Sequence, residues 1–240
     1  MHTLLVNYAD QGFFEAQKLN ATTGRAIGGL ERAVSYSRKD LDAEFCARNE
    51  ETLAKPIGAG NWLWKPYVVV KALREEMNEG DVLFYTDSGC HFIARAKPVI
   101  DLCLQDKEKP ILVFTLDPKF RNRNLVKRDC FYYMNMDRPP YPDMTAILAS
   151  FILCQKNDFS MAFFEEWLDF AQDPRIIGDG PNECGLPNYP DFFEHRYDQA
   201  ILSLLARKYE IANIPDISQW GNGRRPPEIP QIIAQTRWRA

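Results

Sequence analysis

Short apolar segments alternate along this chain with segments that carry helical spacing, and this alternation restricts the possible folds more than any other sequence feature. The apolar segments have the length and composition of buried strands; they are residues 3–9 (TLLVNYA), 82–85 (VLFY), 111–115 (ILVFT) and 150–154 (SFILC). The segments with helical spacing are residues 40–54, 97–107, 158–171 and 196–208. Alternating strands and helices predict an α/β fold with a mixed, mostly parallel sheet flanked by helices.

The most informative stretch runs from a helical segment into a strand and then a polar loop. Residues 61–81 carry Pro66 where a first helical turn tolerates it, and Gly80 where a helix often ends. The strand that follows delivers Asp87 to its carboxyl end, which is where ligands bind in open α/β sheets. A carboxylate there suits Mg²⁺ or Mn²⁺. The plainer alternative is that Asp87 only caps a turn.

Composition narrows the class of partner. The 240 residues suit one domain, and a net charge of −4 without a long Lys/Arg run excludes nucleic acid as the expected partner. The six cysteines form no Cys-x-x-Cys pair, which predicts free thiols. Asp10 and Gln11 interrupt the first apolar run before a signal peptide is complete. We therefore expect a cytoplasmic protein with at most peripheral membrane contact.

Five segments of the sequence, taken together, are more specific than any single motif. They are GAGNWLWKPYVVVKAL (58–73), GDVLFYTDSG (80–89), KRDCFYYM (127–134), DPRIIGDGPNECGLPN (173–188) and EHRYDQAILSLL (194–205). Together they resemble a family of GT-A glycosyltransferases found in bacterial polysaccharide gene sets and in some large viruses, with the likeness spread from Asn7 to Tyr209. The resemblance implies one GT-A (Rossmann-like) domain over residues 1–220. Residues 221–240 would form a Pro/Arg-rich arm.

The resemblance also implies a substrate class and a donor site. It implies sugar transfer from a nucleoside-diphosphate donor, with UDP as the default, to a hydroxyl of a glycan or glycolipid. Tyr85-Thr86-Asp87 stands where many GT-A enzymes carry Asp-x-Asp. Asp87 would hold the divalent metal (Mn²⁺ or Mg²⁺), with Tyr85 beside the donor. The loop after the first strand would place Asn7, Tyr8 and Asp10 against the nucleoside.

The second group of candidates lies at residues 195–199, just before the last apolar helical pattern. Asp198 and Gln199 fall in the first turn of that helix, where a carboxylate is favoured, and the resemblance suggests that they line the donor sugar and acceptor. Asp198 is the candidate general base or electrostatic stabiliser. His195 could complete the metal shell, and Arg196 could offset diphosphate charge. A simpler interpretation makes Asp198 a helix-capping acid and His195 a turn residue.

Three further segments carry weaker signals. Lys65 could pair with a phosphate, and Trp62 or Trp64 could stack on a sugar, although tryptophans more often belong to the core. Residues 127–129 could reach the acceptor or a phosphate, or form only a solvated charge cluster. The Pro/Gly/Asn-rich residues 173–192 are a candidate lid or substrate loop.

Two other functions remain open. A nucleotidyltransferase uses a similar sheet, but no Gly-rich loop bearing Lys or Arg follows the first strand to hold a triphosphate. A glycan-binding or scaffold module that kept the fold without catalysis would also suit the incomplete Asp-x-Asp. Metal-dependent binding of UDP distinguishes the enzyme from the module.

Overall fold

A six-stranded mixed sheet forms the centre of the protein. The computed structural model describes residues 1–218 and 231–235. The strand order is β2 (Arg32–Tyr36), β1 (Thr3–Tyr8), β3 (Val82–Thr86), β6 (Ile147–Gln155), β5 (Ile111–Thr115) and β7 (Ala212–Pro215). β6 runs antiparallel to both of its neighbours, and the pairings give the other five strands a common direction. A second, two-stranded sheet pairs β4 (Cys90–Phe92) with β8 (Ile233–Gln235). The predicted α/β fold with a mostly parallel sheet is confirmed.

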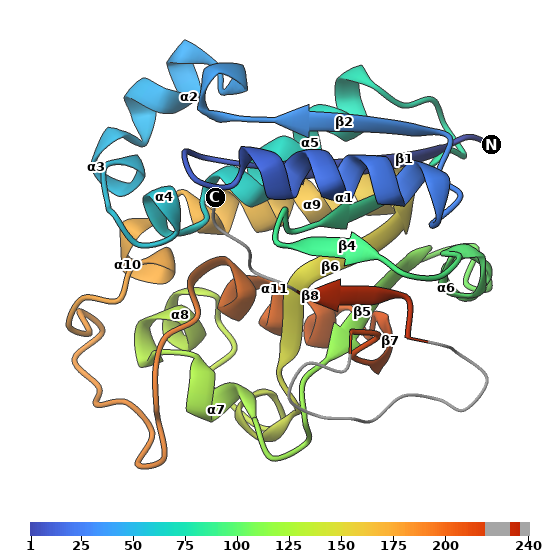
Figure 1. The fold of residues 1–240 in the computed structure, drawn as a ribbon. Coiled ribbons are helices and arrows are strands. Elements are labelled where there is room, and N and C mark those ends of the chain that lie inside the picture. The colour runs from blue at the N-terminus through green and yellow to red at the C-terminus, as the bar shows by residue number, and fades with distance from the viewer. Residues whose placement is uncertain (219–230, 236–240) are drawn as a thin grey trace.

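Helices cover both faces of the large sheet (Figure 1). One face packs against α5 (Trp64–Glu75), α9 (Asp158–Ala171) and α11 (Tyr197–Lys208) in the larger apolar core. The other packs against α1 (Phe14–Ala26), α6 (Lys97–Cys103) and the small sheet. The short helices are α2 (Ala43–Arg48), α3 (Glu50–Leu53), α4 (Gly58–Asn61), α7 (Asn122–Leu125), α8 (Arg128–Tyr133) and α10 (Pro174–Ile177), with 3-10 turns at Arg38–Asp40 and Tyr141–Asp143. No helix within residues 1–218 and 231–235 combines the length and apolarity needed to cross a membrane.

Several apolar patterns are confirmed almost residue for residue, whereas the predicted helix over 97–107 ends at Cys103 and the predicted strand over 150–154 is longer, Ile147–Gln155. β5 and α9 have the predicted bounds, β1 ends at Tyr8, and α11 begins one residue later than predicted. The predicted single helix over 40–54 is wrong, because the chain forms a 3-10 turn and then the two short helices α2 and α3, which meet at Asn49. Asp40 does not begin a long helix; its carboxylate accepts hydrogen bonds from the backbone and hydroxyl of Ser37.

The sequence did not predict helix α1, because the face that this helix buries is not apolar. Its buried residues are Ala16, Gln17, Asn20 and Gly24. A Cβ atom at Gly24 would lie 2.3 Å from Leu5 Cδ2, so glycine is what allows the helix to lie this close to β1. A helix that packs through small and polar residues leaves no apolar periodicity to detect.

The segment before α5 adopts an unusual backbone. Five consecutive residues, 58–62, have positive φ angles between 51° and 104°, and three of them are not glycine: Ala59, Asn61 and Trp62. Left-handed backbone costs about 1–2 kcal/mol per non-glycine residue. Gly60 is packed against the backbone of Leu53, where a Cβ would lie 2.8 Å from Leu53 Cα. The surrounding packing therefore maintains a strained turn directly in front of α5.

Part of the predicted C-terminal arm belongs to the fold. Residues 233–235 form β8, and Ile232 and Ile233 are fully buried in the smaller core. Residues 221–230 and 236–240 of the arm lie outside the described part of the chain.

Replacing Ala59 with glycine should stabilise the protein. Ala59 has φ 51° and ψ 47°, so removing its Cβ relieves the left-handed penalty, and we expect the free energy of unfolding to rise by about 1 kcal/mol in urea denaturation. The matched control is Ala54→Gly, because Ala54 has ordinary right-handed angles, and this change should cost about 0.5–1 kcal/mol. Loss of stability in both variants would contradict a strained turn.

Candidate functional site

Asp87 stands at the end of β3, at the edge of the sheet where the parallel strands finish. Its amide donates to the carbonyl of Ser150 at 2.8 Å, and its carbonyl accepts the amide of Cys90 at 3.0 Å. The hydroxyl of Ser88 donates to the carbonyl of Tyr8, which joins this loop to the end of β1. About a third of the Asp87 side chain remains exposed. The strand therefore delivers a fixed, accessible carboxylate, as the sequence predicted.

Lys65 joins Asp87 to Asp198. Its ammonium nitrogen lies 3.2 Å from Asp87 Oδ1 and 3.0 Å from Asp198 Oδ2, and the Lys65 side chain is only 3% exposed. The third contact of Nζ is a hydrogen bond to the carbonyl of Ala149 at 3.2 Å. A lysine ammonium has three donors, and all three are used here. The expectation that Lys65 pairs with a donor phosphate finds no support in this arrangement.

Aromatic packing places Lys65 in the site. The ring of Trp64 stacks on Tyr8 with centroids 3.9 Å apart, and its indole nitrogen donates to the carbonyl of Gly58 at 2.8 Å. Trp62 packs against Tyr197 at the start of α11, with centroids 5.3 Å apart. Trp64 and Tyr8 are almost fully buried, so they act as core residues. Together, the contacts of Trp64 and Trp62 connect the end of β1, the left-handed turn and α11.

Asp198 lies in the first turn of α11, with its side chain buried. Trp167 fixes the turn by donating its indole N–H to the Asp198 carbonyl at 3.0 Å. Burial raises the pKa of Asp198 to about 6, although the Lys65 ammonium opposes this shift. Burial would lower the pKa of Lys65, but Asp198 and Asp87 outweigh it and hold that pKa above its ordinary value. The buried Lys65 ammonium therefore lies between two carboxyl groups.

Tyr85 and Asn7 support the site from inside the protein. The fully buried Tyr85 donates its hydroxyl to Asp87 Oδ1 at 2.9 Å, and burial raises its pKa well above the ordinary value. Asn7 is also fully buried and donates to Asn20 Oδ1 at 2.7 Å. Neither side chain offers surface to a nucleoside, so the predicted donor contacts of Tyr85 and Asn7 find no support. Asp10 is half-buried in the loop after β1.

Asn20 is a supporting residue that the sequence analysis missed. It accepts the hydrogen bond from Asn7 and donates to the Thr86 hydroxyl at 2.7 Å and to the Cys90 carbonyl at 2.9 Å. These contacts join α1 to the ends of β1 and β3, on either side of Asp87. A lone asparagine in a weakly patterned segment gave no signal of this role.

The other residues of the 195–199 group lie in different surroundings. His195 Nδ1 accepts the amide of Lys127 at 3.2 Å, and burial, together with the charge of Lys127, lowers the pKa of His195 to about 3. Arg196 pairs with Glu194 at 2.6 Å. Gln199 is buried in the first turn of α11. The structure thus brings together Asp198, Lys65 and Asp87, and leaves His195 and Arg196 with other partners.

The fit of a divalent metal can be judged from these surroundings. Asp87 is a hard oxygen donor that is partly exposed, and both of its contacts with Lys65 and Tyr85 use Oδ1. Within the described ranges, no group of three His, Cys, Asp or Glu side chains could surround a metal. His195 is 6% exposed and its Nδ1 accepts a backbone amide, whereas its buried Nε2 has no hydrogen-bond partner among the described residues. Its role as second ligand therefore stays a prediction. Among these residues Asp87 could therefore hold a cation only with further ligands from outside the protein.

Comparison with known proteins bears on the fold. No protein-family model and no curated protein sequence matches the chain. Among solved structures, the chain is similar to apo mouse xyloside xylosyltransferase 1, with a TM-score of 0.51 over 98% of this chain and 96% of that one, at 10% sequence identity. The chain has a GT-A-type fold. At this level of identity the similarity extends to architecture alone.

Removing the Lys65 charge should destabilise the protein strongly. Lys65→Met keeps the length of the side chain but leaves buried Asp198 without its cation, and breaking a buried pair costs about 3–5 kcal/mol. The control is Lys71→Met, because Lys71 pairs with the exposed carboxylates of Asp42 and Glu75, and its loss should cost less than about 1 kcal/mol. Urea denaturation of both variants measures the contrast, and equal losses would refute the assigned role of Lys65.

The raised pKa of Asp198 predicts a pH dependence of stability. The native carboxyl titrates near pH 6 and the unfolded one near 3.8, so the folded protein binds more protons between these values. The contribution of Asp198 to the free energy of unfolding should therefore fall as pH rises through that window and stay level above it. Comparing wild type with Asp198→Asn from about pH 4 to pH 7 isolates the effect. A contribution that rises with pH would contradict the assignment.

Proposed function

We propose that this protein is a glycosyltransferase that moves a sugar from a nucleoside-diphosphate donor, with UDP as the first candidate, to a hydroxyl of a glycan or glycolipid. The observation that carries the proposal is the Asp87–Lys65–Asp198 cluster at the carboxyl edge of a GT-A-type sheet. In open α/β folds this edge is where ligands bind. The resemblance of the five sequence strings to GT-A glycosyltransferases supports the same reaction.

The transfer requires a hydroxyl oxygen to bond to the anomeric carbon while the bond from that carbon to the diphosphate breaks. The nucleoside diphosphate leaves with the bonding electrons, and the hydroxyl proton passes to a base. Asp198 is the candidate base for an inverting reaction; for a retaining one, Asp198 or Gln199 would stabilise an oxocarbenium-like state. Because Asp198 is buried and paired with Lys65, its surroundings favour the electrostatic role over direct proton transfer.

Asp87 would hold a Mn²⁺ or Mg²⁺ ion together with the donor diphosphate. When bound, such an ion neutralises negative charge on the leaving group. Tyr85 and Lys65 both contact Asp87 Oδ1, and they orient the carboxylate before any ligand arrives. The chain's own contribution is therefore a preorganised acidic group at the mouth of the sheet.

A glycan-binding module without catalysis is the second candidate. Its support is the position of Lys65, whose ammonium already fills the space between the two carboxylates. Such a module would bind sugars but would not need a metal or a nucleotide. A nucleotidyltransferase has less support, since the loop after β1 contains no Lys or Arg between Asp10 and Phe14.

Metal-dependent stabilisation by UDP tests the proposed function. With Mn²⁺ present and UDP at about one hundred times its Kd, wild type should gain about 2.7 kcal/mol, which raises the Tm by roughly 5–10 °C for a chain of this size. Asp87→Asn and EDTA should each abolish the shift. The control is Asp101→Asn, because Asp101 is exposed and pairs with Lys97 on the surface of α6.

The UDP experiment and a screen of sugar nucleotides together distinguish the transferase from the glycan-binding module. Hydrolysis of one sugar nucleotide in a screen with Mn²⁺ would name the donor. Equal UDP stabilisation with and without EDTA would contradict the role of Asp87 as metal ligand. No stabilisation by UDP, together with no hydrolysis of any sugar nucleotide in the screen, would overturn the transferase and favour the glycan-binding module.

A further inference from the structure

A polar cavity lies beside the start of α11, next to the cluster of charged residues. It has a volume of about 270 Å³ and is lined by the side chains of Lys127, Asp179, Asn188, Phe192, Glu194, His195 and Tyr197. Tyr197 precedes the buried Asp198 along the chain and packs against Trp62. The cavity therefore adjoins the first turn of α11, and it includes His195, the predicted second metal ligand.

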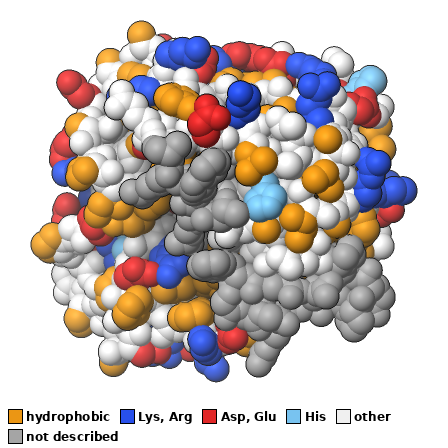
Figure 2. All heavy atoms as spheres, in the orientation of Figure 1, with side chains coloured by type: hydrophobic (Ala, Val, Ile, Leu, Met, Phe, Trp, Pro, Cys, Tyr) orange, Lys and Arg blue, Asp and Glu red, His pale blue; other side chains and the backbone are white. Residues whose placement is uncertain are grey.

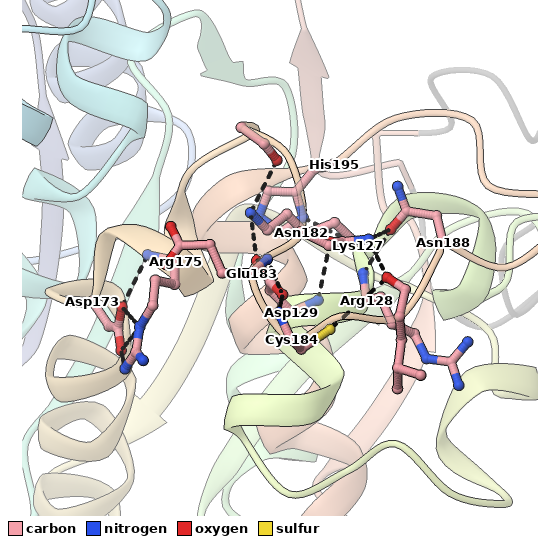
Figure 3. A network of polar contacts seen from close by, with 12 residues as sticks. Lys127, Arg128, Asp129, Asp173, Arg175, Asn182, Glu183, Cys184, Asn188 and His195 are labelled. Atoms are coloured by element: carbon pink, nitrogen blue, oxygen red, sulfur yellow. Dashed lines mark hydrogen bonds and ion pairs between the residues drawn. The ribbon is translucent and has the colours of Figure 1, made fainter.

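The walls of the cavity are held by a buried network (Figure 3). The carboxylate of Asp129, which is fully buried, accepts the amides of Glu183 and Cys184 at 2.9–3.0 Å and pairs with the Lys127 ammonium at 3.2 Å. Asn188 accepts the amide of Arg128 at 2.7 Å. Such contacts tie the loop over residues 178–196 to α8, so the cavity exists before any ligand binds. The sequence left open whether residues 127–129 contact a ligand or form a solvated charge cluster. In the structure they hold the loop against α8.

The charges around the cavity do not suit an anion. Lys127 is the cation among its described lining residues, and its ammonium is used by Asp129 and by the Gly180 carbonyl at 3.2 Å. Two carboxylates, those of Asp179 and Glu194, are on exposed residues of the lining, and Glu194 pairs with Arg196. A phosphate or carboxylate ligand would meet the Asp179 carboxylate, while the Lys127 and Arg196 cations are already engaged by other carboxylates. Surface charges of both signs are also interspersed over the face drawn in Figure 2, with no continuous basic area among its coloured side chains.

The same lining suits a neutral polyhydroxyl ring. Carboxylates accept hydrogen bonds from sugar hydroxyls, and the rings of Phe192 and Tyr197 offer apolar faces to C–H groups. Tyr197 donates its hydroxyl to Asp179 Oδ2 at 2.9 Å, which orients that carboxylate. Phe193, with 76% of its surface exposed, stands between two lining residues. The volume is just below the range of pockets for drug-sized ligands, which favours one sugar unit over a whole nucleotide sugar.

We propose that this cavity binds one neutral pyranose unit of the acceptor glycan, through hydrogen bonds to Asp179 and Glu194. The acceptor assignment rests on the proposed transferase function, whereas binding of a neutral sugar does not. A unit held here lies beside the first turn of α11, which carries Asp198, so the cavity selects the acceptor while the cluster at Asp87 serves the donor.

Saturation-transfer NMR with the full chain tests the proposal. The probes are methyl glycosides of glucose, galactose, mannose and xylose at about 10 mM, with methyl glucuronide as an anionic analogue. At least one neutral glycoside should bind, and the glucuronide should bind roughly tenfold more weakly because of the two carboxylates. Asp179→Asn and Glu194→Gln should each weaken neutral binding by roughly tenfold, which is the usual cost of losing a charged hydrogen bond. Glu15→Gln, on the exposed start of α1, is the matched control.

The outcomes separate this proposal from the proposed function. Binding of a neutral glycoside that depends on Asp179 and Glu194 supports the cavity, even if wild type shows no UDP stabilisation, in which case the chain is a glycan-binding module. Failure of all four neutral glycosides to bind overturns the cavity assignment, whatever UDP does. Tighter binding of the glucuronide, or neutral binding unchanged in both variants, also overturns it.

Discussion

The ion pair network centred on Lys65 is the interaction on which the rest of the site depends. One buried ammonium satisfies two carboxylates that come from different parts of the chain, Asp87 after β3 and Asp198 in α11. Without that charge, Asp198 would be a buried anion next to a second carboxylate, which is costly in a medium of low polarity. Loss of the Lys65 charge would therefore be costly, and the network fixes the spacing of the two acidic groups in one arrangement.

The strained turn before α5 helps to position Lys65. Residues 58–62 adopt left-handed angles, and the turn is held by the Trp64 hydrogen bond to Gly58 and by packing of Gly60 against Leu53. Strain of this kind persists only where surrounding contacts over-determine the backbone, and it is often found at functional sites. Here the turn lies just before Lys65, the residue that contacts both Asp87 and Asp198. The same aromatic contacts join the turn to β1 and α11.

The two proposed ligand sites differ in how they are built. The donor site uses strand ends and the first turn of a helix, so its charges are fixed by the sheet and by the larger core. The cavity beside Tyr197 uses an irregular loop whose Glu183 and Cys184 amides donate to Asp129, and whose Asn188 side chain accepts the amide of Arg128. A rigid scaffold with a variable loop beside it is a common way for one fold to serve different substrates.

The sequence by itself determined the elements whose buried faces are apolar, such as β5 and α9, and the placement of Asp87 at a strand end. It did not reveal α1, whose buried face consists of small and polar residues, or the edge strand β2, of which only Tyr36 is buried. The partners of individual side chains were decided by tertiary structure alone. Lys65 contacts two carboxylates from distant parts of the chain, and His195 Nδ1 accepts a backbone amide. The reason is physical: apolar periodicity is a local property of the chain, whereas a buried charge is stabilised by groups that only folding brings within reach.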